Sequence, residues 1–201
     1  MKTAENTRII DKAVDLLRKA AVELEEFQVQ ASLGKAELKD TYEDTKKKFN
    51  QFIHDSKFKM KQGEEAYDNM RQSLDELIVQ LNLGKAETVD AFKEQKRNIL
   101  LKLHEIEVAI TTNATLNKVY DNLLIEIEKF KVKLDILETK LEKGSERFKT
   151  NYEDGKKEFL DFVERMKNKY QNQEEDETPW EHFQGEMTEA FKHFKNAFSK
   201  S

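Results

Sequence analysis

The chain contains no cysteine, which excludes disulfide bridges, a thiol nucleophile and a thiolate metal site. It has one proline and only six glycines in 201 residues, so few positions interrupt regular helices. There is no run of about 20 apolar residues, and the N-terminal sequence MKTAENTRIIDKAVDLL lacks the continuous apolar stretch of a signal peptide. These absences predict a soluble, cytoplasmic, helical protein.

Apolar residues are also scarce, at 37% of the chain, with a mean hydropathy of −0.85. That is too little for a core of several layers, but a narrow seam between helices needs less. Charged residues make up another 37%, and the net charge of −5 offers no general attraction to a polyanion, so we expect no nucleic-acid partner. No phosphate-binding glycine loop, EF-hand loop or nucleophile elbow is present, so we expect no enzyme activity, cofactor, metal or small-molecule substrate.

What the chain does contain is one segment written three times, centred on Gly34, Gly84 and Gly144. Aligned on the glycine, apolar residues recur in steps of three and four, the period of an amphipathic helix. The positions ten, seven and three residues before the glycine and eight and fifteen after it are Leu24, Leu74, Leu134; Phe27, Leu77, Leu137; Ala31, Leu81, Leu141; Tyr42, Phe92, Tyr152; and Phe49, Ile99, Phe159. A repeat of this length predicts three copies of one structural unit.

The fold predicted from this pattern is all-α: an elongated antiparallel three-helix coiled-coil bundle over residues 1–170. Its helices are expected at about 3–61, 64–111 and 115–170. Whether each helix continues through its glycine is open. The apolar phase carries across, and Lys35 and Lys85 are poor N-caps, which favours continuity over reversal. In continuous helices, Gly34, Gly84 and Gly144 would lie in the seam and allow close helix approach.

Residues 171–179 read as an acidic linker, and residues 180–201 as a short amphipathic helix begun by Thr178 and Pro179. One side of this helix carries large apolar residues: Trp180, Phe183, Met187, Phe191, Phe194 and Phe198. Such a side must be buried somewhere. It can fold back on the bundle, self-associate, or dock on a membrane surface or another protein.

Candidates for chemistry are few. His54 and His104 occupy equivalent repeat positions, but neither belongs to a metal-binding pattern, and shared ancestry explains the pair. The acidic pairs lie among lysines, as on a solvated helix face. Three basic clusters follow the glycines, at 46–48, 96–97 and 156–157; they could form a patch for anions, although pairing within the helix is the default expectation.

The wording VQ-x-x-LGKAE-x-x-D-x-[YF], followed by lysine-rich turns, and the ending PWEHFQGEMTEAFKHFKNAFSKS resemble a loosely defined group of bacterial coiled-coil stress-response proteins. The third repeat departs from this wording, with Lys143, Gly144, Ser145 and Glu146 in place of LGKAE. The resemblance implies a cytoplasmic helical protein linked to stress tolerance. It supplies no catalytic residue to carry over.

We therefore expect a non-enzymatic structural or interaction protein that acts through self-association or by docking another protein. The alternative is a peripheral lipid-surface protein, similar to apolipoproteins or membrane-curving helical proteins, in which the C-terminal aromatic helix enters the interface.

Overall fold

The computed structural model describes eight stretches of the chain: 2–31, 35–58, 65–113, 116, 121–143, 148–171, 185–192 and 194–195. Within them the secondary structure is helical, without strands, which confirms the all-α prediction. The helices are α1 (Lys2–Gln30), α2 (Lys35–Phe58), α3 (Glu65–Leu81), α4 (Val89–Thr112), α6 (Asp121–Lys143) and α7 (Phe148–Gln171). Residues 185–192 and 194–195 are also helical. The predicted linker, apart from Gln171, lies outside the described residues, as do Gly34 and Gly144.

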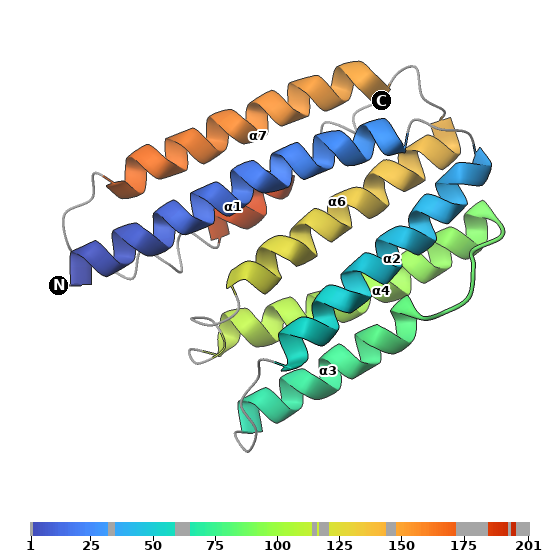
Figure 1. The fold of residues 1–201 in the computed structure, drawn as a ribbon, viewed down its shortest axis with the longest axis horizontal. Helices are drawn as coiled ribbons and strands as arrows, with labels where there is room; N and C mark the ends of the chain where they lie inside the picture. Colours follow the sequence, from blue (N-terminus) through green and yellow to red (C-terminus); the bar gives the residue numbers. More distant parts are fainter. Residues whose placement is uncertain are drawn as a thin grey trace.

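The prediction of three uninterrupted helices is wrong. Each expected rod is two helices that run in opposite directions, so the chain forms the hairpins α1/α2, α3/α4 and α6/α7 (Figure 1). The described turn shows why. α3 ends at Leu81, and α4 begins only after Thr88, whose side chain accepts a hydrogen bond from the Ala91 amide at 3.1 Å. The N-cap is thus four residues beyond Gly84, whereas the sequence argument looked for it next to the glycine.

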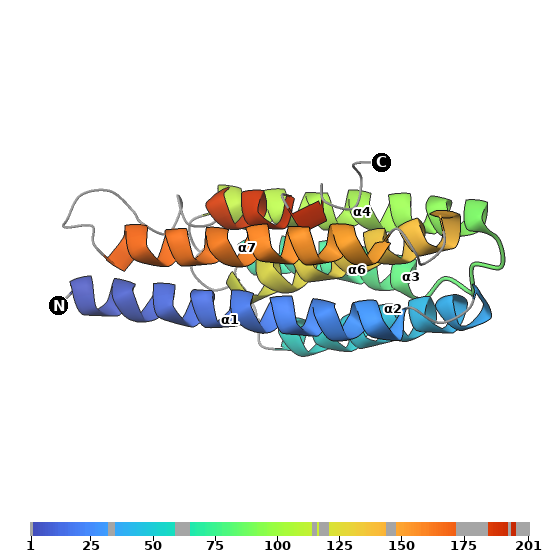
Figure 2. The ribbon, with the colours of Figure 1, turned by 90° about the horizontal axis from the view of Figure 1, so that it is seen from above.

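Folding back brings helices from different repeats into contact, and the coiled-coil seam is not confirmed. Contacts between α2 and α3, α3 and α4, α4 and α6, and α6 and α2 close one group of four helices. A second group contains α1, α7, α6 and helix 185–195; α1 packs on α6 and α7, while Phe191 and Phe194 pack on Phe159 of α7. Figure 2 shows the axes of these helices nearly parallel.

Helix α6 belongs to both groups and is buried over most of its surface. Its buried residues are Leu123, Leu124, Ile125, Ile127, Glu128, Lys129, Phe130, Val132, Leu134, Asp135, Ile136, Leu137, Lys140 and Leu141. A helix that is buried over most of its surface lies at the centre of a fold. The apolar repeat positions do face the core as predicted: Tyr42, Phe92 and Tyr152 are each at most 2% exposed.

Candidate functional site

A hollow lies between α1 and α2, where α6 forms the floor. These two helices are consecutive in the chain, yet each packs against α6 (Figure 1). The hollow has a volume of about 290 Å³. We call it the α1–α2 groove; its lining residues are Glu23, Glu26, Phe27, Gln30, Thr41, Asp44, Thr45, Lys48, Phe49, Phe52, Glu126, Lys129, Phe130 and Lys133.

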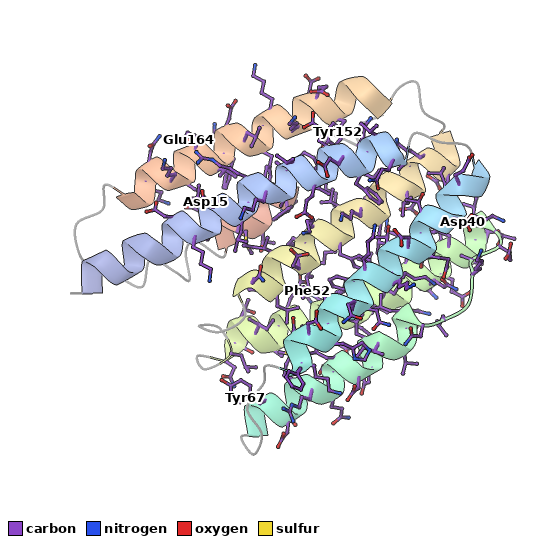
Figure 3. All side chains as sticks on the ribbon, viewed as in Figure 1. Asp15, Asp40, Phe52, Tyr67, Tyr152 and Glu164 are labelled. Atoms are coloured by element: carbon purple, nitrogen blue, oxygen red, sulfur yellow. The ribbon has the colours of Figure 1, made fainter. Side chains whose placement is uncertain are left out.

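The floor of the groove is aromatic. The rings of Phe49 on α2 and Phe130 on α6 are stacked, with centroids 4.0 Å apart, and both side chains are buried. Phe27 of α1 is buried beside them. Phe52 is only partly buried and points from α2 toward α6 (Figure 3). An aromatic floor of this kind can accept apolar side chains of a ligand or partner.

The rim carries charges of both signs, and most of them neutralise each other. Lys129 contacts Glu23 at 2.7 Å and Glu126 at 2.6 Å, and Lys48 contacts Asp44 at 2.7 Å. Lys133 is different. Its ammonium group lies 5.4 Å from the centroid of the Phe27 ring and forms no ion pair with any other residue that the structure describes.

The environment of Lys133 disfavours its charge. Burial is the main cause that lowers the pKa of Lys133, and the neighbouring Lys129 lowers it further. An anionic group placed in the groove would relieve both effects. The carboxylates of Glu23 and Glu126 offset the pKa shift of Lys133 in part. The groove therefore has an apolar floor and two lining charges, Lys133 and Glu26, that form no ion pair with another described residue.

The aromatic side of the C-terminal segment is used within the fold. Met187, Phe191 and Phe194 are at most 2% exposed. Phe194 meets Tyr152 of α7 with centroids 5.5 Å apart, and Lys195 Nζ lies 3.1 Å from Asp135 Oδ2 on α6. Trp180, Phe183 and Phe198 lie outside the described residues. In this arrangement the three described aromatic-stripe residues are not accessible to a partner or membrane, so a docking role requires the helix to leave α7.

The predicted close-approach role of Gly84 is wrong. Gly84 is exposed in the turn before α4, and a Cβ atom placed on it would meet no heavy atom within 4 Å. Its carbonyl oxygen accepts a hydrogen bond from Gln95 Nε2 at 2.7 Å. Because the chain reverses here, the glycine lies at the end of a hairpin instead of between two packed helices.

The basic clusters after the glycines hold helices together. Their first lysines are buried or part-buried. Lys96 pairs with Asp135 and Glu138 of α6, and Lys156 contacts Glu25 of α1 at 2.6 Å. Lys46 donates to the Leu83 carbonyl oxygen at 2.9 Å, in addition to its pair with Glu43. These lysines contact other segments of the fold, whereas the sequence pattern favoured pairing within one helix. The signal was present, because each follows the buried aromatic position by four residues and so shares its helix face.

The histidine candidates stay isolated. His54 and His104 are exposed and do not line the groove. In the described stretches no three histidine, aspartate or glutamate side chains are grouped so as to hold a metal ion. No helix among the described ones is both long and apolar enough to cross a membrane.

Comparison with protein-family models, with curated proteins and with solved structures gives no significant match. The function must therefore be argued from the geometry of the chain itself.

Proposed function

We propose that this chain is a non-enzymatic interaction protein whose binding surface is the α1–α2 groove. The observation that carries the proposal is the open aromatic floor between two helices that are not packed on each other. Phe52 at this floor is only partly buried, and covering apolar surface contributes about 25 cal/mol per Å² removed from water, so a partner seated in the groove would be stabilised by covering it.

The dimensions fit the side chains of a protein helix. The groove-lining residues of α1 cover positions 23–30 and those of α2 positions 41–52, which is about two to three helical turns. A helix lying on the rim could insert residues spaced by three and four into the floor, as amphipathic helices do in other grooves. The partner is a second copy of this chain or another protein. A cytoplasmic location and a role in stress tolerance, implied by the resemblance, form part of the same proposal.

A photo-crosslinking experiment tests the proposal. A benzophenone amino acid replaces Gln30 on the groove rim, and in a matched control it replaces Leu101, which is 57% exposed on α4. Purified protein is irradiated alone and with an extract of the source cells. We expect discrete adducts from position 30 that are reduced about tenfold when Thr41→Trp fills the groove, and no such adducts from position 101. Equal yields at both positions, or adducts unaffected by Thr41→Trp, would contradict the proposal.

Lipid-surface binding is the second candidate, and the helix at 185–195 is the observation in its favour. It is amphipathic, with Met187, Phe191 and Phe194 on its buried side and Glu189 and Lys192 exposed on the other. Such a helix could exchange the surface of α7 for a membrane interface. Flotation of the full chain with vesicles tests this. Lipid binding should make the amides of 185–195 and their contacts on α7 exchange differently, and a protein that stays at the bottom of the gradient removes this candidate.

A further inference from the structure

We propose that the occupant of the α1–α2 groove is the α1 helix of a second copy of this chain, so that two copies form a two-fold symmetric dimer through this face. The inference rests on the proposed function and names its partner. The inserting element is an exposed ridge of α1 formed by Val22, Glu26 and Val29, which we call the α1 ridge.

The α1 ridge places two apolar side chains on a solvent-facing surface. Val22 is 54% exposed and Val29 is 63% exposed, and with Glu26 they follow the spacing of one helix face. The acidic neighbours of Glu26 are neutralised within the chain, since Glu23 contacts Lys129 and Glu25 contacts Lys156. Glu26 forms no ion pair with another residue in the described part of the chain. The ridge therefore presents two apolar side chains separated by one unpaired anion.

The groove beside it is complementary. Its floor is apolar, and Lys133 is the cation among its lining residues that forms no ion pair with another described residue. The other lining charge without such a pair is Glu26, which the ridge and the groove share. The ridge and the groove are neighbours on one face of the molecule, because Glu26 belongs to the ridge and also lines the groove. A surface that carries a protrusion next to its own complement is suited to an isologous contact, in which each copy gives and receives the same residues.

Glu26 and Lys133 also lie at similar positions along the axes of α1 and α6. α1 and α6 run in the same direction (Figure 1), and Glu23 is level with Lys129, which it contacts at 2.7 Å. Glu26 lies three residues further along α1, and Lys133 four residues further along α6, which is about 4.5 Å and about 6 Å at 1.5 Å per residue. A two-fold axis parallel to the helices, placed between ridge and groove, preserves height. It brings Glu26 of each copy to Lys133 of the other, with Val22 and Val29 over the aromatic floor.

Charge reversal at Glu26 and at Lys133 tests this pairing, and the double variant tests whether the reversed pair restores it. The mass of the purified full chain is measured by light scattering over a concentration series, together with Glu26→Lys, Lys133→Glu and the double variant. The unaltered chain should approach twice 23.7 kDa. Each single reversal should weaken dimerisation on the order of a hundredfold, because symmetry repeats the repulsion twice. The double variant should recover most of the loss, whereas Glu94→Lys on the exposed side of α4 should have no effect.

Circular dichroism of every variant shows that the helices are intact. A chain that stays monomeric at all concentrations overturns the inference, and so does a dimer that is indifferent to the single reversals or is not rescued by the double one. These results leave the proposed function standing if groove-dependent crosslinks to another protein form. The absence of such crosslinks from position 30 overturns the proposed function itself, so the two failures are distinguishable.

Discussion

Charged side chains that are buried in this fold have partners from other helices or from the backbone. Lys96 pairs with Asp135 and Glu138, and Lys140 donates to the Gln28 carbonyl oxygen at 2.8 Å. A buried charge without a partner costs several kcal/mol, so such contacts are a condition for keeping lysines in the core. They also select the helices that can be neighbours. A lysine at the repeat position of α4 needs the acidic residues of α6.

Glu128 is a buried group whose charge is only partly compensated. Burial raises its pKa to about 7, although Lys131, with Nζ at 3.0 Å from Oε1, opposes the shift, and Glu107 adds to it. The folded state therefore binds a proton that the unfolded chain releases near pH 4.5. The stabilising contribution of this proton is complete below about pH 4.5 and is lost as the pH rises through about 7.

We expect the Glu128→Gln variant not to show this decrease in stability as the pH rises. The free energy of unfolding of the unaltered chain should fall relative to that of the variant by about 3 kcal/mol between pH 4.5 and pH 8. Urea denaturation followed by circular dichroism across this range measures the difference. Glu94→Gln, at an exposed position, is the control. A difference between chain and variant that does not change with pH would show that Glu128 is ionised normally.

The position of Gly84 makes a second residue-level prediction. Its φ lies outside the left-handed region and open space surrounds the site of a Cβ, so Gly84→Ala should be neutral or stabilising by about 0.5 kcal/mol. A glycine between packed helices would instead give a loss of about 1–3 kcal/mol from overpacking. Chemical denaturation separates the two outcomes, and a large loss would restore the close-approach interpretation.

At the scale of elements, the helix at 185–195 completes the second group of four helices. Its aromatic side chains meet Tyr152 and Phe159, which are the positions eight and fifteen residues after the third glycine. The corresponding residues of the first repeat, Tyr42 and Phe49, meet Phe92 and Phe130 instead. In the third hairpin these aromatic positions therefore pack against the C-terminal helix. In the first hairpin they pack against helices of the second and third hairpins.

Phe194→Ala should therefore destabilise the fold by about 3–5 kcal/mol, because the side chain is fully buried between Tyr152 and Phe159. Lys192→Ala, on the exposed side of the same helix, should change stability by less than about 0.5 kcal/mol. Thermal and urea unfolding of both variants provide the measurement. Similar stability for the two variants would mean that the helix does not rest on α7 in solution.

At the scale of the whole molecule, the division of each rod into two helices sets the shape. Continuous helices of about 55 residues would be about 80–85 Å long, whereas the longest helix here, α1, has 29 residues and is about 44 Å long. The shorter helices surround α6, so that most of its surface is removed from water. One central helix shared by two groups also couples their stabilities.

Small-angle scattering should therefore give a maximum dimension well below 85 Å for the monomer. The Lys133→Glu variant, in which dimerisation is weakened, is the sample to use, and dilution of the unaltered chain to the monomer serves as its control. Scattering from a rod of about 85 Å or longer would instead support helices that continue through the glycines.

Several features of the fold are readable from the repeats alone. The helical period, the scarcity of proline and the absence of long apolar runs predict an all-α chain, and the apolar positions around the glycines predict its core residues correctly. The reversal of the chain at the glycines could not be predicted from the sequence. The apolar phase of Gly84, Thr88 and Phe92 fits a continuous helix, and only the use of Thr88 as an N-cap ends it.

The sequence by itself determined that the chain is helical and which face of each helix is apolar, because both follow from local spacing. The tertiary structure alone decided where the helices reverse and that α6 lies at the centre. It also decided that α1 and α2 stay apart, which leaves a groove lined by Phe27, Phe49 and Phe130. These outcomes depend on contacts such as those of Lys96 with Asp135 and Phe49 with Phe130, between residues 39 and 81 positions apart. Short-range periodicity carries no information about such pairs, since many partners satisfy the same apolar or charged face.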